Sequence, residues 1–300
     1  MKRFVAVVFL LAVAVTAQAG LDRTAVSLYG SDANPCSLTA PCATFAKAIS
    51  ETNPLGELIA LDSGGYDGFT VDRAMTITVA PGVVVTVGQE PGVTNWAIKV
   101  NAPGKRVSLR GLMVVTKGSA MGIVAHDAAA TYIDDVVIEG SACEIGCGTA
   151  IFGRRGDLFV NHARIRNVFQ GINHNPLEPS TATITNTTVD QAELTGIGID
   201  NYAKGVIRNT VVTRSGKAFS TGALTKGAKP EMTLVDCMAT SSTTGVMVGN
   251  ASNVHMERTA VSRNVTGVWN SGGTIFTHGN NMVSGNGTDV SGVVTAAGLI

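Results

Sequence analysis

The chain has 300 residues, with 22 basic and 22 acidic side chains, so its formal net charge is zero. This balance argues against a nucleic-acid partner, which requires a basic excess or a basic stripe with interleaved aromatic residues. Charged residues make up only 15% and aromatic residues 5% of a chain with 35 glycines, and the many threonine, serine, asparagine and valine residues favour β structure.

The N-terminus has the features of a secretory leader. Met1–Arg3 is positively charged, an apolar run of twelve residues follows, and Ala17 and Ala19 are the small residues that a signal peptidase accepts. The apolar run is too short for a comfortable membrane span, and no later run is long enough. We expect residues 1–19 to be a cleaved signal peptide and the mature protein to be exported, to the periplasm or outside the cell. An uncleaved anchor is the alternative.

Residues 20–55 are predicted to form an N-terminal cap. Within the stretch TFAKAISE, Phe45, Ala48 and Ile49 fall on one helical face, so a short helix can cover the end of an apolar core. An open solenoid needs such a cover, because its end exposes strand edges and apolar side chains.

The five cysteines fit an oxidising compartment. Cys36 and Cys42 are close in sequence, as are Cys143 and Cys147, and each pair is predicted to form a local disulfide. A zinc site at Cys143 and Cys147 is the alternative, but no second pair at matching spacing accompanies it. We expect no metal or cofactor, and we expect the remaining Cys237 to be buried and reduced.

Residues 56–300 carry a loose repeat. A small residue followed by an apolar one recurs at intervals of 28, 21, 25, 26, 23 and 22 residues, at Gly122-Ile123, Ala150-Ile151, Gly171-Ile172, Gly196-Ile197, Gly222-Ala223, Gly245-Val246 and Gly267-Val268. Periods in the twenties indicate a solenoid, and the stretch 68–87 alternates apolar and polar residues with a period of two, which is typical of strands. The sequence predicts an all-β coil of short stacked strands.

A second recurring position predicts the corners of this coil. Asp135, Asn186, Asn209 and Asp236 each follow a strand-like segment by the same offset, and His162 takes the position in one repeat. Short Asn and Asp side chains hydrogen-bond to neighbouring turns and tolerate the left-handed conformation of a tight corner. We therefore interpret these residues as architecture and not as catalytic groups.

The chain resembles secreted right-handed parallel β-helix proteins of the pectin-lyase-like superfamily, and within it an uncharacterised bacterial group. The resemblance rests on GSDANPCSLTAPCATFAKAI (30–49), LDSGGYDGFTV (61–71), VSLRGLMV (107–114) and HGNNMVSGN (278–286). It implies a right-handed parallel β-helix over nearly the whole mature chain. The superfamily includes polysaccharide lyases, hydrolases, epimerases and non-enzymatic adhesins, so the resemblance does not imply one reaction. The motifs typical of its pectate lyases, polygalacturonases and epimerases are absent from this sequence.

The resemblance also implies where a ligand would bind, because in this fold the outer face of the first strand lines the carbohydrate groove. At the second position after each repeat mark stand Val124, Phe152, Asn173, Gly198, Leu224, Met247 and Trp269. At the fourth position stand His126, Arg154, Asn175, Asp200, Lys226, Gly249 and Ser271. The third position faces inward, so His174 is expected in the bore as a buried, hydrogen-bonded histidine.

We expect this face to bind a polysaccharide or a cell-surface partner, through Phe152, Asn173, Asp200, Lys226 and Trp269. The alternative is a uronate lyase in which His126 is the base and Arg154 neutralises the substrate carboxylate. A hydrolase is disfavoured, because it needs two facing carboxylates and Asp200 is the only one on this face. A solvated face that carries scattered charges and binds no ligand is a further alternative. The sequence leaves open binding or catalysis, the glycan and the oligomeric state.

Overall fold

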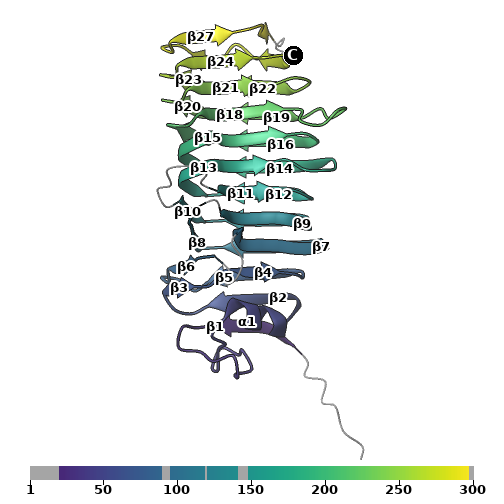
Figure 1. The fold of residues 1–300 in the computed structure, drawn as a ribbon, viewed down its shortest axis with the longest axis vertical. Coiled ribbons are helices and arrows are strands. Elements are labelled where there is room, and N and C mark those ends of the chain that lie inside the picture. The colour runs from purple at the N-terminus through teal and green to yellow at the C-terminus, as the bar shows by residue number, and fades with distance from the viewer. Residues whose placement is uncertain (1–19, 90–94, 119, 141–147, 297–300) are drawn as a thin grey trace, which may run out of the picture.

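The computed structural model describes residues 20–89, 95–118, 120–140 and 148–296. Its strands form a stack of coils, with the helix α1 (Phe45–Glu51) at the N-terminal end (Figure 1). Neighbouring coils pair in parallel, for example β11 with β13 and β18 with β21. The predicted all-β parallel β-helix with a short capping helix is confirmed.

Each coil contributes strands to three faces, which we name sheets A, B and C in the order in which the chain visits them. Sheet A contains β4 (Phe69–Val71), the first halves of β7 (Trp96–Arg110) and β9 (Met121–Asp134), β11 (Thr149–Gly153), the last parts of β13 (Arg164–His174) and β15 (Thr188–Asp200), β18 (Lys217–Gly222), β21 (Thr244–Val248), β24 (Thr266–Asn270) and β27 (Thr288–Ser291).

Sheet B contains β1 (Leu21–Val26), β2 (Thr52–Ala60), β5 (Met75–Val79), the last parts of β7 and β9, β12 (Asp157–Asn161), β14 (Ser180–Thr185), β16 (Ala203–Arg208), β19 (Glu231–Val235), β22 (Asn253–Glu257), β25 (Thr274–Thr277) and β28 (Thr295–Ala296). Sheet C contains β3 (Gly64–Tyr66), β6 (Val85–Val87), β8 (Leu112–Thr116), β10 (Val137–Gly140), the first parts of β13 and β15, β17 (Val211–Thr213), β20 (Met238–Thr240), β23 (Ala260–Ser262) and β26 (Met282–Val283).

The bore of the coil is filled by side chains that stack between paired strands. In sheet A one inward position is apolar in every coil from β9 to β24, namely Ile123, Ile151, Ile172, Ile197, Phe219, Val246 and Val268. All of these side chains are buried. Because side chains alternate along each strand, the residues between them face outward, and the outer face of sheet A becomes a set of straight columns.

The predicted corner residues lie between sheets B and C and adopt the left-handed conformation. Their φ angles run from 46° to 54° at Asp135, His162, Asn186, Asn209 and Asp236. The Asn209 amide donates a hydrogen bond of 2.7 Å to Asn186 Oδ1, as expected for a ladder. The residue after each corner points inward, and Cys237 at this position is a buried thiol outside any disulfide, as predicted.

The helix α1 at the N-terminal end buries the three residues predicted for its capping face. Phe45, Ala48 and Ile49 are the buried residues of α1, and Thr44 accepts a hydrogen bond from the Lys47 N–H as the N-cap. Cys36 and Cys42 form the predicted disulfide. Residues 1–19 and the pair Cys143 and Cys147 lie outside the described residues. Among the described residues, no helix combines the length and apolar character needed to cross a membrane.

The register expected for one coil is wrong. Phe219 pairs with Ile197 and with Val246, so the repeat mark of this coil is Ala218-Phe219 and not Gly222-Ala223. Spacing alone does not distinguish the two marks. Each is a small residue followed by an apolar one, and each lies 21 to 28 residues from the neighbouring marks. Packing decides between them, since the large ring of Phe219 fills the bore and Ala223 does not reach it.

Candidate functional site

Two outward columns run along sheet A. The first consists of Lys99, Val124, Phe152, Asn173, Gly198, Ser220, Met247, Trp269 and Ser291. The second consists of His126, Arg154, Asn175, Asp200, Gly222, Gly249 and Ser271. Six of the seven predicted site residues therefore lie on this face, in the predicted order.

Lys226 is the exception, because of the register error in its coil. It lies exposed in the segment between β18 and β19, and Gly222 takes its place beside Asp200. The lysine whose charge acts on Asp200 is Lys217, at the start of β18. Leu224 is likewise replaced on the first column by Ser220.

The two columns create a polar cradle at the centre of the sheet, formed by Asn173, Gly198, Asp200 and Ser220. A Cβ atom on Gly198 would lie 3.4 Å from Asp200 Oδ2 and 3.6 Å from both Asn173 Nδ2 and Ser220 Oγ. The missing side chain of Gly198 thus leaves a space that three polar side chains face. An amide donor, a hydroxyl and a carboxyl group around one space are the groups that recognise sugar hydroxyls.

Asn173 is unusual for an outward residue. Its side chain is only 8% exposed, and its Oδ1 has no hydrogen-bond partner among the described residues. A buried unpaired amide oxygen costs about 1–3 kcal/mol, so most proteins avoid it. The orientation of Asn173 is therefore not explained by packing or by internal hydrogen bonding.

Asp200 is the second unusual group in the polar cradle. Burial raises its pKa to about 7, partly offset by a hydrogen bond of 3.1 Å from the Gly222 N–H and by the nearby Lys217 charge. Near neutral pH this carboxyl group is present both with and without its proton. It can therefore donate or accept a hydrogen bond, or exchange a proton with a bound molecule.

A cationic cluster, Lys99, Arg154 and Arg155, surrounds His126 about three coils, or roughly 14 Å, from Asp200. Burial and then the charges of Lys99 and Arg154 lower the pKa of His126, which favours the neutral imidazole. Its Nδ1 lies 3.1 Å from Asn101 Oδ1, and in the tautomer that donates from Nδ1 to this oxygen Nε2 is the basic nitrogen.

His174 faces the bore, as predicted. It is completely buried, and Nε2 lies 2.8 Å from Ser180 Oγ, but Nδ1 has no partner among the described residues. Burial lowers its pKa to about 4. Gly153 lies against its ring, and a Cβ there would approach the ring nitrogen to 2.3 Å. The predicted hydrogen bonding is thus only half present, and the role of His174 is to fill space.

Aromatic side chains lie toward the two ends of the first column. Phe152 is half-buried and Trp269 is 40% exposed. The strand pairings place them five coils apart, which corresponds to about 24 Å. This span exceeds one sugar unit and suits an extended chain.

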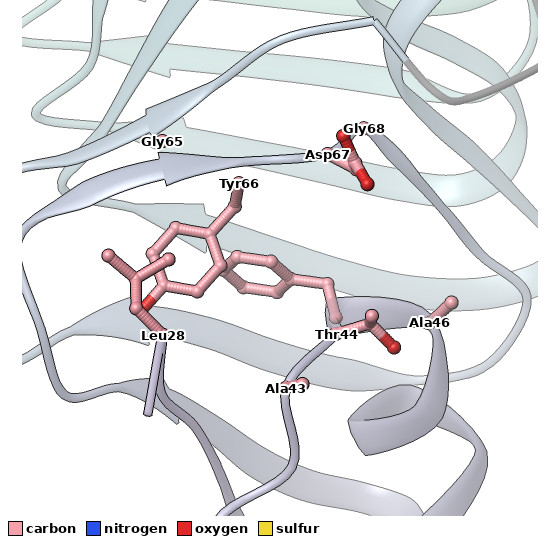
Figure 2. A pocket seen from close by; sticks show the side chains of 9 residues that line it. Leu28, Ala43, Thr44, Ala46, Gly65, Tyr66, Asp67 and Gly68 are labelled. Atoms are coloured by element: carbon pink, nitrogen blue, oxygen red, sulfur yellow. The ribbon is translucent and has the colours of Figure 1, made fainter. Parts of the chain in front are cut away.

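A hollow of about 300 Å³ lies at the N-terminal end, between α1 and the first coil (Figure 2). The ring of Phe45 packs edge-on against Tyr66 and stacks on Phe69, with centroid distances of 5.2 and 4.5 Å. Thr44 at its rim is occupied by capping α1 and by Asp32. We assign this hollow to the packing of the cap. Within the described part of the chain, no three His, Cys, Asp or Glu side chains group closely enough to hold a metal ion.

Sequence reasoning missed Lys99, Ser220 and Lys217 as parts of this face, and it placed Gly198 on the first column without a role. Gly198 stood on the correct column but carries no side chain, so no chemical type marked it. Ser220 and Lys217 were hidden by the register error. The signal that could have found Ser220 and Lys217 is Phe219, a large ring directly after the small residue Ala218.

Comparisons with known proteins agree with this architecture. Residues 122–298 match the model of a family described as the right handed beta helix region. No curated protein sequence matches the chain.

Several solved structures share the fold at low sequence identity. The complex of XylC with xylose has a TM-score of 0.59 at 10% identity, and the alignment covers 84% of this chain and 68% of the XylC chain. An alginate lyase from Paenibacillus sp. str. FPU-7 has a TM-score of 0.55 at 14% identity, and the alignment covers 87% of this chain and 100% of the lyase chain. The pectate lyase Pel9A has a TM-score of 0.51 at 12% identity, and the alignment covers 92% of this chain and 78% of the Pel9A chain. At these identities the likeness is one of fold, and together with the family match it shows that the chain belongs to the right-handed β-helix family.

Proposed function

We propose that the protein binds an extended acidic polysaccharide along the outer face of sheet A. The observation that carries this proposal is the polar cradle, in which Asn173, Asp200 and Ser220 converge on the empty space above Gly198. The amide nitrogen of Asn173 faces this space, as does the Asp200 carboxyl group of raised pKa, and both can hydrogen-bond to a ligand placed there. Such a ligand offsets part of the cost of burying the carboxyl group.

Charge and shape along the same face support an acidic chain. Within the cationic cluster Arg155 lies 3.9 Å from Glu178, so Lys99 and Arg154 are the charges offered to carboxylate groups, about 14 Å from the cradle. Phe152 and Trp269 provide apolar ring surface on which sugar faces pack. The fold-level neighbours include a xylose complex and proteins named as alginate and pectate lyases, which also supports a saccharide ligand.

Affinity for a panel of polysaccharides tests the proposal. Polygalacturonate, alginate and hyaluronan would be compared with neutral xylan at two salt concentrations, for the native protein, Trp269→Ala and Arg154→Ala. We expect an acidic chain to bind, Trp269→Ala to weaken binding at both salt concentrations, and Arg154→Ala to weaken it chiefly at low salt. Absence of binding, or native affinity in both variants, would overturn the proposal.

A uronate lyase is the second candidate, and the neutral His126 beside Arg154 favours it. Nε2 of His126 can take the proton next to the uronate carboxylate, while Arg154 and Lys99 stabilise the negative charge that develops there. The unsaturated product absorbs ultraviolet light. Catalysis would be established if absorbance increases with the native protein and not with His126→Ala, on a polysaccharide that both proteins bind. If absorbance does not increase with any acidic polysaccharide that the native protein binds, the protein binds without cleaving.

Export remains part of the proposal. The Cys36–Cys42 disulfide supports an oxidising compartment, where the predicted leader of residues 1–19 would direct the chain. Detection of the mature N-terminus at Gly20 in the exported fraction would test it.

A further inference from the structure

Sheet B carries a pair of aromatic rings on its outer face. Tyr132 in β9 and Phe159 in β12 occupy paired positions, and their rings stack with centroids 4.6 Å apart and planes within 7°. The pairing direction of the strands is the long axis of the coil. The ring faces therefore look along that axis, while the ring edges point away from the sheet.

The stack stops after two rings. The neighbours in the same column are Ser108 on the Tyr132 side and Thr183 on the Phe159 side, both too small to cover a ring. The outer faces of the pair are consequently open, and a hollow of about 300 Å³ surrounds them. A flat group placed above Thr183 would continue the stack as a third ring.

The next column of sheet B forms a polar wall beside the rings. Arg110 Nε lies 3.0 Å from Asp134, Asn161 donates to Asp134 at 2.8 Å, and Thr185 donates to Asn161 at 2.8 Å. The charges of Arg110 and Asp134 compensate one another. The wall therefore offers hydrogen-bonding groups without a net charge, and the Arg110 side chain, 61% exposed, keeps donors available to a ligand.

We propose that this hollow is a second saccharide site, which takes one pyranose ring of a neutral polysaccharide. The apolar face of the sugar stacks on the free face of Phe159 above Thr183, and its edge hydroxyls meet the polar wall. The site is on a different sheet from the polar cradle and does not depend on the function proposed for sheet A. A protein with both sites would hold a charged and an uncharged polysaccharide at once.

The test fills the proposed ring position with a ring of the protein. Thr183→Phe continues the stack of Tyr132 and Phe159 and occupies the hollow without removing any existing contact of the rings. Thr233→Phe is the matched control in the same column, where the added ring continues the stack of His255 on Phe276, with centroids 4.7 Å apart. Thermal melting would show that both variants are folded.

Isothermal titration with cellohexaose, xylohexaose and mannohexaose would measure binding. We expect at least one of these neutral probes to bind the native protein and Thr233→Phe equally, and Thr183→Phe to raise its Kd by about ten-fold or more. Trp269→Ala should leave this affinity unchanged, which separates the site from sheet A. Binding of none of the three probes, or equal binding by Thr183→Phe, would overturn the proposal.

Discussion

The outer faces of sheets A and B are built from the same repeat but treat their polar groups in opposite ways. On sheet B, Asp134 is paired with Arg110 and hydrogen-bonded to Asn161. On sheet A, the Asn173 amide oxygen is buried without a described partner, and burial raises the pKa of Asp200 to about 7.

The difference shows where stability was not the only requirement. A parallel coil stacks like on like, so each polar side chain has a neighbour about 5 Å away in the next coil and can readily be satisfied. On the outer face of sheet B, Asp134 and Asn161 use this property, whereas on sheet A the amide oxygen of Asn173 does not. The unsatisfied groups of sheet A therefore mark the candidate binding face more clearly than any sequence motif.

The largest effect that we expect is on the pH dependence of stability. The pKa of His174 is lowered from 6.5 to about 4 in the folded state. Between these values the unfolded chain binds a proton that the folded chain does not, so His174 destabilises the fold as the pH falls from 6.5 to 4. Asp200, with its pKa raised to about 7 from 3.8, holds a proton that the unfolded chain has lost, so it destabilises the fold as the pH rises from 3.8 to 7. In the native protein the two contributions oppose one another.

Single substitutions should expose each contribution. Relative to the native curve, His174→Gln should gain stability on acidification from pH 6.5 to 4.5, and Asp200→Asn should lose it. Each difference should reach on the order of 2–3 kcal/mol across the window. Denaturant unfolding at a series of pH values would measure it, and curves parallel to that of the native protein would contradict the assignment of these pKa values.

The next effect contrasts a corner with the binding face. Asn209 has a φ of 46° and donates a 2.7 Å hydrogen bond to Asn186, so Asn209→Leu loses the bond and strains the backbone. Asn209 is exposed, so the left-handed backbone is a larger cost for leucine than the lost hydrogen bond. We expect a loss of about 1–2 kcal/mol in the free energy of unfolding, with unchanged glycan affinity. Asn209→Gly, which tolerates this φ, should lose less. A Tm of Asn209→Leu equal to that of the native protein would show that the ladder has no energetic role.

Asn173→Leu should behave in the opposite way. It removes an unpaired buried oxygen and keeps a side chain of similar volume, so the free energy of unfolding should stay the same or rise by up to about 1 kcal/mol. Affinity for the acidic polysaccharide should fall, because the amide that faces the cradle is lost. If Asn173→Leu is destabilised and keeps native affinity, Asn173 has a structural role like that of Asn209, and its assignment to the binding face is wrong.

Much of the fold could be predicted from sequence, and the reason is the repeat. The left-handed corners at Asn186 and Asp236 and the capping face of Phe45 follow from local chemistry that each residue carries by itself. The register of the coil around Phe219 could not be predicted, because Ala218 and Gly222 fit the period equally well and only packing in the bore selects one.

The candidate site was harder to predict for a related reason. Phe152, Asn173 and Trp269 were found because their positions follow from the alternation of side chains along a strand. The cradle itself depends on a space above Gly198, and a space belongs to the neighbouring coils rather than to any one residue. Burial of Asn173 and Asp200 is likewise a property of the assembled face.

The smallest effect separates the true from the expected lysine. Lys217→Ala removes the charge near Asp200, so we expect affinity for the acidic chain to fall by about two- to five-fold at low salt and to be unaffected at high salt. Lys226→Ala, off the columns, should bind like the native protein. Titrations of both variants at two salt concentrations would measure this. A larger loss of affinity in Lys226→Ala than in Lys217→Ala would favour the register expected from the sequence, with Gly222-Ala223 as the repeat mark.

The most direct test of the central claim is the affinity of Gly198→Val for the acidic polysaccharide that the native protein binds. Gly198 has no positive φ, and its Cβ would make ordinary contacts of 3.4–3.6 Å, so the backbone accepts a side chain whose methyl groups fill the cradle. Thermal melting would show that the variant is folded. Gly65→Val, whose Cβ would have no neighbour within 4 Å, is the matched control on sheet C. We expect Gly198→Val to lose about 100-fold or more in affinity and Gly65→Val to lose none; a folded Gly198→Val that binds like the native protein would show that the cradle is not the binding site.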